Sequence, residues 1–122
     1  MVIIIAKIRL KNFSDRDVMF AAMKAATPPS LKEPGAIAYQ SFIDHEDPLV
    51  INGIDIFASE EAVVAHNRSE HIAALASAIS GIDADIDVRS YHGDMEPFDL
   101  SRLPTAAVWT DTAFIQASDV SS

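Results

Sequence analysis

The sequence predicts an α+β fold: a ferredoxin-like sandwich in which one antiparallel four-stranded sheet carries its helices on one side. The first observation is the period-two alternation of apolar side chains over residues 2–10, which is typical of a strand. The second is a pair of apolar segments, 36–44 and 49–57, joined by a short polar connection. Helix patterns follow the first and third strands, and a fourth strand is predicted over 83–91. The resulting order β-α-β-β-α-α-β is that of a ferredoxin-like sheet.

Composition limits the classes of function. The 122 residues fit one domain, and a hydrophobic content of 49% with a mean hydropathy of +0.16 supplies apolar surface for a core. A formal net charge of −9 disfavours nucleic acid and anionic membranes as partners. The absence of cysteine excludes disulfides and thiolate chemistry. The apolar start, residues 1–6, lacks a basic leader and is too short to span a bilayer, so we expect a cytoplasmic protein.

The predicted strands differ in how their faces are divided. In the first strand one face is apolar throughout and carries Ile4, Ala6, Ile8 and Leu10. The other face is apolar only at its start and carries Ile3, Ile5, Lys7 and Arg9. The strand over 36–44 is expected to place Ile37, Tyr39 and Ile43 on the same face. The strand over 49–57 is largely apolar on both faces.

The predicted helices have recognisable starts. Ser14 can cap the first helix, which we expect to run to about Ala26 and then to kink or restart at the Pro28-Pro29 pair. Ser59 and Ser69 are good N-caps, and each is followed by glutamate, which is favourable in the first turn. Two short helices are therefore predicted after the third strand.

Apolar residues on both faces of the sheet predict a homodimer, because the face without helices needs a cover and a second subunit related by a two-fold axis can supply it. Residues 1–92 form the predicted domain, and 93–122 form a C-terminal extension. We expect this extension to cross the dimer as an arm, to place Trp109 or Phe114 on the partner, and to end in a disordered segment. An arm packed on its own subunit is the alternative.

Residues 51–81 carry the most specific pattern in the chain. Its parts are Glu60-Glu61-Ala62, Ala65-His66, Ser69 and His71, in that order. This order resembles the signature of the antibiotic biosynthesis monooxygenase family of small dimeric α+β barrel proteins, and the resemblance extends from about Val2 to Tyr91. The family's third strand usually ends in an acid, one residue and a tryptophan, where this chain has Asp55, Ile56 and Phe57.

Three residues are candidates for catalysis. Asp55 lies in an apolar strand, where desolvation can raise its pKa and make it a usable base; an ion pair with Lys7 or Arg9 is the alternative. His71 is expected at the start of a helix, where the positive end of the helix dipole helps to keep the imidazole neutral, or it hydrogen-bonds the loop. The resemblance implies that His66 lies beside the cleft; the alternative is a histidine that packs the helices.

The predicted substrate pocket is apolar. Gly53 marks a bulge or space for a ligand, and it shares a strand face with Asp55 and Phe57. Tyr39 and Phe42, from the neighbouring strand, complete the candidate binding residues, although such aromatic residues are more often core.

No metal or cofactor is expected. Five positions along one helix would place two histidine side chains about 140° apart, unlike a zinc-binding i, i+4 pair, although a break at Ser69 weakens this objection. The four glycines form no nucleotide-binding motif. Haem-degrading relatives use a tryptophan and a histidine where this chain has Phe57 and approximately Ala76, which disfavours haem.

The resemblance implies a cofactor-independent monooxygenase that oxidises a small aromatic, phenolic or quinol-type substrate with dioxygen. In that chemistry the protein removes a proton, holds the electron-rich anion in a dry pocket and admits oxygen. The alternatives are a non-enzymatic dimeric module that binds a small apolar ligand and an isomerase-like relative of the same fold.

Overall fold

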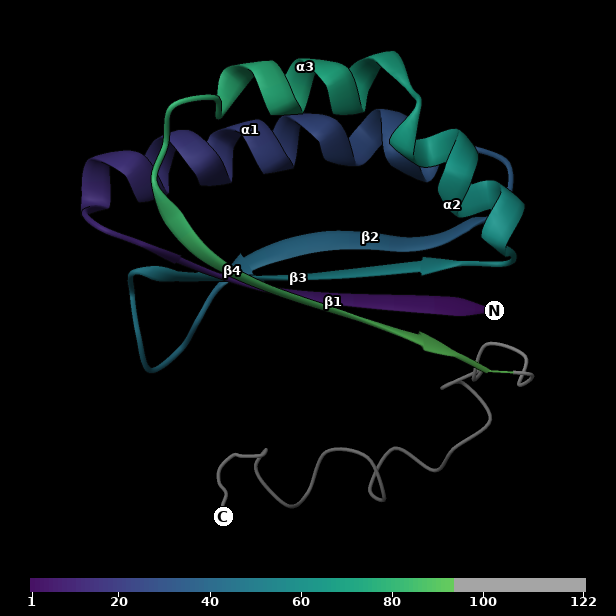
Figure 1. Ribbon diagram of the computed structural model, residues 1–122, viewed down its shortest axis with the longest axis horizontal. Helices are drawn as coiled ribbons and strands as arrows, with labels where there is room; N and C mark the ends of the chain where they lie inside the picture. The colour runs from purple at the N-terminus through teal and green to yellow at the C-terminus, as the bar shows by residue number, and fades with distance from the viewer. Residues whose placement is uncertain (94–122) are drawn as a thin grey trace.

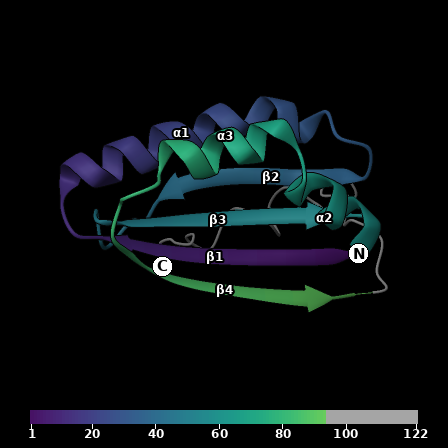
Figure 2. The ribbon, with the colours of Figure 1, turned by 45° about the horizontal axis from the view of Figure 1, so that its top comes forward.

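The computed structural model describes residues 1–93 and has the predicted α+β architecture. One antiparallel sheet has its three helices on one side (Figures 1 and 2). The elements in chain order are β1 (Val2–Leu10), α1 (Phe13–Leu31), β2 (Ala36–Ile43), β3 (Val50–Phe57), α2 (Glu60–Asn67), α3 (Glu70–Ala78) and β4 (Ala84–His92). The predicted order of elements and the ferredoxin-like arrangement are thereby confirmed.

The strand register determines which side chains meet the helices. The strands lie in the order β2-β3-β1-β4, and all neighbours are antiparallel. Gly53 is opposite Ala6, and Ala6 is opposite Val88, so these three share the helix-facing side, hereafter the inner face. Ile54 and its partner Ile5 belong to the opposite, outer face. Every second residue of each strand therefore borders the space between sheet and helices.

Two apolar clusters hold the helices on the inner face. One is built on Ile8, Leu10, Met19 and Ile51, and the other on Ala26, Tyr39 and Phe57. Phe57 and Ile51 are fully buried. Burial of side chains of this size contributes about 1.5–3 kcal/mol each, so these clusters account for much of the attachment of the helices to the sheet.

The N-cap of the first helix lies two residues before the predicted one. Asn12, not Ser14, is the N-cap: its side-chain oxygen accepts the backbone N–H of Asp15 at 2.8 Å, and its backbone is extended. Asparagine is at least as good an N-cap as serine. The prediction that Ser14 caps the helix is wrong because the strand ends early enough for Asn12 to take that position.

The first helix also passes its predicted end at Ala26. It continues through Pro28 and Pro29 to Leu31, although neither proline has an N–H to donate to the preceding turn. Ala26 and Ser30 are buried against the rest of the protein, and the Thr27 hydroxyl donates to the Met23 carbonyl at 3.3 Å. Packing of the last turns therefore outweighs the local cost of the prolines.

The second strand contains an irregularity that the sequence did not predict. The register shifts between Ala36 and Ala38, which leaves Ile37 as an extra residue and brings Tyr39 opposite Asp55. The expectation that Ile37 and Tyr39 share a face is wrong: Tyr39 is buried at 8% exposure, whereas Ile37 is 39% exposed. The bulge thereby sets which residues of β2 face the helices.

The caps of the two short helices are as predicted. Ser59 accepts the backbone N–H of Ala62 at 3.2 Å, and Ser69 accepts that of Ile72 at 3.4 Å. The Ser69 hydroxyl also donates to the carbonyl of His66 at 2.7 Å, which fixes the turn between the helices. This turn changes the direction of the chain between two histidines.

The predictions for the C-terminal extension, including those for Trp109 and Phe114, lie outside the described residues. Among residues 1–93, no helix has the length and apolar character needed to cross a membrane.

Candidate active site

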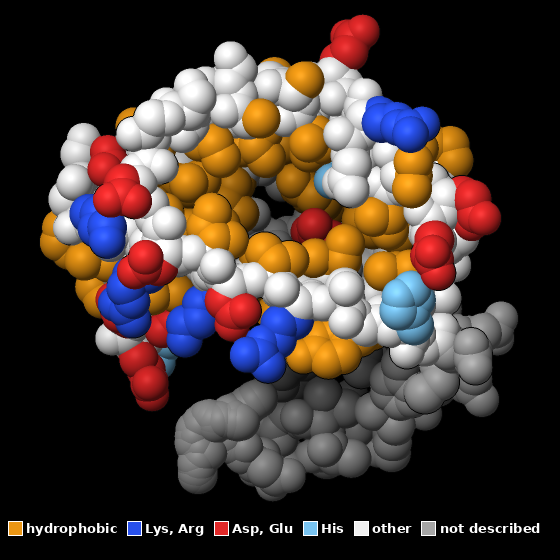
Figure 3. Space-filling view, in the orientation of Figure 1, with side chains coloured by type: hydrophobic (Ala, Val, Ile, Leu, Met, Phe, Trp, Pro, Cys, Tyr) orange, Lys and Arg blue, Asp and Glu red, His pale blue; other side chains and the backbone are white. Residues whose placement is uncertain are grey.

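A hollow lies between the helices and the inner face of the sheet. Figure 3 shows it surrounded by hydrophobic side chains, with an acidic side chain visible inside. Ile86 and Val88 of β4 are on the inner face by register but are 58% and 57% exposed, because α3 packs on α1 rather than over this edge strand. Since β4 is left uncovered, the apolar interior is open to a small molecule from the β4 edge.

Asp55 is the one acidic residue on the inner face of the described strands. It is partly buried, and this desolvation raises the pKa of its carboxyl group from 3.8 to about 6, while the charge of nearby His66 acts in the opposite direction. The alternative of an ion pair with Lys7 or Arg9 is excluded by register, because both project from the outer face and Arg9 pairs with Asp47. A carboxyl group with this pKa can exchange protons near neutral pH.

Tyr39 lies directly beside Asp55, across the β2–β3 pair. Burial raises the pKa of the Tyr39 phenol to about 12, and the negative charge of Asp55 adds to this effect. The nearby Ser30 hydroxyl lowers the pKa of the phenol and so opposes the effect of burial. The Ser30 oxygen is itself buried and makes no hydrogen bond of standard geometry among the described residues. The phenol thus keeps its proton at neutral pH and can donate it to an oxygen atom of a ligand.

His66 of α2 packs against two aromatic residues of the sheet, Tyr39 and Phe57. Its ring centroid lies 5.1 Å from that of Tyr39 and 4.9 Å from that of Phe57, and the residue is only 5% exposed. These tilted contacts are typical of aromatic packing. His66 therefore packs against the second apolar cluster, and its Nδ1 atom is directed at the loop before β2.

The sequence reasoning missed Glu33, which lies in that loop and joins both histidines. His66 Nδ1 lies 3.0 Å from each carboxylate oxygen of Glu33, and His71 Nε2 contacts Glu33 Oε2. A carboxylate accepts and does not donate, so each ring donates through the nitrogen that faces Glu33. The His71 contact agrees with the interpretation in which this residue hydrogen-bonds the loop.

The position of Glu33 depends on the turn that follows it. Gly35 has a φ of +84°, and its carbonyl accepts the backbone N–H of Ala58 at 2.8 Å, which anchors the turn to the end of β3. A glutamate before a Pro-Gly turn has no periodicity that would distinguish it from a surface acid. Two histidines near an expected cleft were the only signal in the sequence for an acid between them.

The structure brings most of the predicted site residues together. Asp55, Tyr39, Phe57 and His66 are neighbours, and the rings of His66 and His71 are 6.0 Å apart. Gly53 is also on the inner face; it forms no bulge, but the missing side chain leaves space beside Met23 Cε, which would lie 3.7 Å from a Cβ atom there.

Phe42 is not part of this group. It pairs with Asn52 on the outer face and is 40% exposed, so its prediction as a residue of the same pocket is wrong. The bulge at Ile37 and the strict alternation after it turn Phe42 away from the helices.

Solved structures share this fold. A conserved protein of unknown function from Bacteroides thetaiotaomicron, described as a candidate oxidoreductase, is 26% identical, with a TM-score of 0.67 over 74% of this chain and 94% of its own. Candidate antibiotic biosynthesis monooxygenases from Deinococcus radiodurans and Nitrosomonas europaea are each 14% identical and show similarity of fold alone. The Deinococcus protein has a TM-score of 0.71 over 82% of this chain and 98% of its own. The Nitrosomonas protein has a TM-score of 0.70 over 78% of this chain and 100% of its own.

Comparison with curated protein sequences gave no match. The family model of antibiotic biosynthesis monooxygenases, in contrast, matches residues 1–78, which include β1 to α3 and the polar residues of the site, from Glu33 to His71, but not β4. By this match, the chain belongs to the antibiotic biosynthesis monooxygenase family.

Proposed function

We propose that this protein is a cofactor-independent monooxygenase that oxidises a small aromatic, phenolic or quinol-type substrate with dioxygen. The observation that carries the proposal is Asp55, a carboxyl group with a pKa raised to about 6 on the inner face of the sheet, among largely apolar neighbours. A base of this strength, held away from bulk water, suits removal of a proton from a weakly acidic carbon or phenol.

The proposed reaction begins with proton transfer to Asp55. For an activated CH₂ group between two aromatic rings, this leaves an electron-rich anion that reacts with dioxygen. One oxygen atom becomes the new carbonyl oxygen and the other leaves as water, so the substrate supplies all the electrons. The apolar walls contributed by Ile86 and Val88 suit a flat aromatic molecule and limit water around the anion.

Tyr39 has the complementary role in this proposal. Its phenol stays protonated because burial raises its pKa to about 12, and it lies beside Asp55. A proton donor at this place can hydrogen-bond the oxygen atom of the substrate that gains negative charge. Asp55 then acts as the base and Tyr39 as the donor.

Oxygen consumption tests the proposal. Metal-free and flavin-free protein is mixed with a panel of quinols and anthrones, and uptake is followed with an oxygen electrode. Wild type is expected to consume oxygen and the Asp55→Asn variant to lose at least about 99% of the rate, as expected for removal of a general base. Asp83→Asn, at an exposed acid outside the hollow, is the matched control and should retain the rate. No uptake by wild type with any member of the panel contradicts the proposal.

The alternative is a non-enzymatic module that binds a small apolar ligand, or an isomerase-like relative. The open apolar wall at Ile86 and Val88 favours ligand binding as such. Tight binding of an anthrone with no oxygen uptake would support the binding module. Substrate rearrangement without oxygen uptake would support the isomerase.

We also propose that the protein acts as a homodimer joined through the outer face of the sheet. This face carries Ile3, Ile5, Ile54 and Ile56 at neighbouring register positions, and Ile5 is 43% exposed. An apolar patch on a sheet is commonly covered by a second subunit. Sedimentation at micromolar concentration tests this, and a folded monomer would refute it.

A further inference from the structure

The cluster formed by Glu33, His66 and His71 is not used by the proposed oxidation, and it has the composition of a metal site. We propose that these three side chains bind one divalent first-row transition-metal ion, of the kind that prefers nitrogen and oxygen ligands, such as Zn²⁺ or Fe²⁺. Two imidazoles and one carboxylate are a common protein ligand set for such ions.

The distances within the cluster suit this set. One ligand atom from each of the three residues lies within 4.8 Å of the other two, and His66 Nδ1 lies 3.0 Å from the Glu33 carboxylate oxygens. Ligand atoms at about 2.1 Å from an ion are about 3.0–3.4 Å from one another in octahedral or tetrahedral geometry. The His66–Glu33 pair already has this separation, and the widest pair, within 4.8 Å, needs a contraction of at most about 1.4–1.8 Å.

The three residues come from parts of the chain that the fold holds in place. Glu33 lies in the turn between α1 and β2, His66 in the last turn of α2 and His71 in the first turn of α3. The Ser69 turn between the helices brings the two imidazole rings to 6.0 Å, which a continuous helix would not do. Sequence spacing argued against a metal for this reason, and the break in the helix removes that objection.

The burial of the three side chains also favours the binding of an ion. The side chains of His66, Glu33 and His71 are 6%, 14% and 22% exposed. An apolar surrounding strengthens the attraction between a cation and the carboxylate, which would otherwise be weakened by water. The remaining accessibility leaves coordination positions for water on the side of Glu33 and His71.

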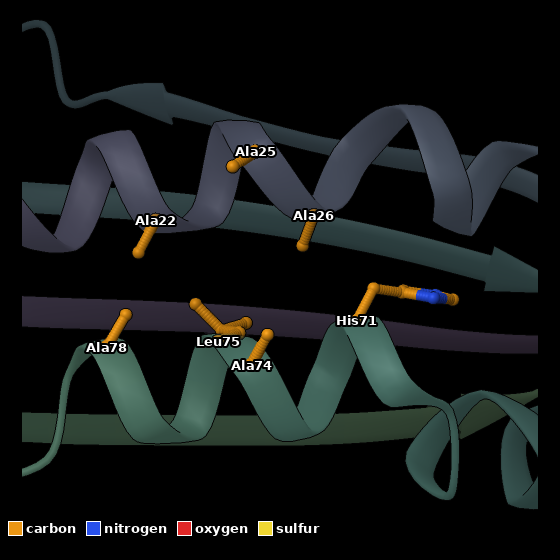
Figure 4. Close-up of a pocket in the computed structure, with 7 residues that line it drawn as sticks. All are labelled: Ala22, Ala25, Ala26, His71, Ala74, Leu75 and Ala78. Carbon is orange, nitrogen blue, oxygen red and sulfur yellow. The ribbon is translucent and has the colours of Figure 1, made fainter.

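Two surface hollows give an ion access to the cluster. One has a volume of about 430 Å³ and is lined by Glu33 and Ser69, together with residues of the turn and of α2. The other has a volume of about 240 Å³ and is lined by alanines of α1 and α3, with His71 at one end (Figure 4). The cluster therefore lies between solvent on two sides and the buried aromatic residues on a third.

Metal binding would replace the hydrogen bonds that the two imidazoles make to Glu33. In the described structure His66 Nδ1 and His71 Nε2 carry the hydrogens that face Glu33. A coordinating imidazole nitrogen carries no hydrogen, so on binding these hydrogens leave the nitrogens that face Glu33, and those nitrogens coordinate the ion. The ion thus replaces two hydrogen bonds with three coordinate bonds, and it ties the loop before β2 to both short helices.

Calorimetric titration of chelator-treated full-length protein with Zn²⁺ tests the inference, with Co²⁺ as a spectroscopic probe. Wild type is expected to bind one ion per chain and to give visible Co²⁺ absorption bands from a site with nitrogen ligands. Glu33→Gln keeps the shape of the side chain but removes the charge, and it should weaken binding by at least about tenfold. His45→Gln removes an exposed loop histidine and should leave the affinity unchanged.

Circular dichroism checks that each variant is folded. If Glu33→Gln does not fold, His71→Asn tests the same ligand set at the more exposed histidine. Equal Zn²⁺ affinity in wild type and the ligand variant, loss of binding in His45→Gln, or no binding at millimolar Zn²⁺ would each overturn the metal site. Oxygen uptake by metal-free protein is measured separately, so the outcome of this test does not depend on that of the proposed oxidation.

Discussion

Replacing Asp55 with asparagine should stabilise the protein at neutral pH and leave its stability nearly unchanged in acid. Asparagine has almost the same shape but no charge, so the variant isolates the cost of burying a carboxylate. In the folded protein the pKa of Asp55 is raised from 3.8 to about 6, mainly by desolvation. The native state therefore favours the protonated acid.

The sign and size of the effect follow from this difference. Below pH 3.8 the carboxyl group is protonated in both the folded and the unfolded chain, and the charge costs nothing. As pH rises toward 6 the unfolded chain ionises first, so wild-type stability falls; above about 6 the full cost is present. Since a tenfold change in proton affinity corresponds to about 1.4 kcal/mol, the variant gains at most about 3 kcal/mol.

Urea denaturation at a series of pH values between 3.5 and 8 measures the gain. The difference between the free energies of unfolding of variant and wild type should be near zero at the acid end and should approach its maximum by pH 7. Asp83→Asn, an exposed acid, supplies the control for a general change in net charge. A difference that is independent of pH, or an Asp55 variant less stable than wild type at pH 7, would refute the reasoning that burial raises this pKa.

Further predictions follow from the caps, the turns and the outer face. Asn12→Ala should lower the free energy of unfolding by about 1 kcal/mol in urea denaturation, whereas Ser14→Ala should change it by less than about 0.5 kcal/mol; equal effects would contradict the assigned N-cap. Gly35→Ala should destabilise by about 2 kcal/mol or more, because φ is +84° and the new Cβ would lie 2.9 Å from a methyl group of α2. Gly81→Ala has a similar φ of +88° with nothing within 4 Å, so a cost of about 1 kcal/mol is expected, and a cost as large as at position 35 would argue against the contact. Ile54→Lys should convert a dimer to a monomer in sedimentation analysis, and an unchanged dimer would exclude this face as the interface.

The sequence by itself determined the type and order of the elements. Period-two alternation in β1 and the serine caps of α2 and α3 act through neighbouring residues, so they can be read without knowing the fold. Asp55 was recognisable for the same reason, since one acid in an apolar strand stands out locally. The signature around His66 and His71 further identified the family.

Tertiary structure alone decided where α1 ends and which residues meet at the site. The prolines oppose the helix locally, but burial of Ala26 and Ser30 stabilises its last turns. The extra residue Ile37 in β2 determines that Tyr39 faces inward and Phe42 outward, and one added residue changes this for the rest of a strand. Glu33 meets the histidines only because Gly35 turns the chain back toward α2, a contact between residues more than thirty positions apart that no local pattern encodes.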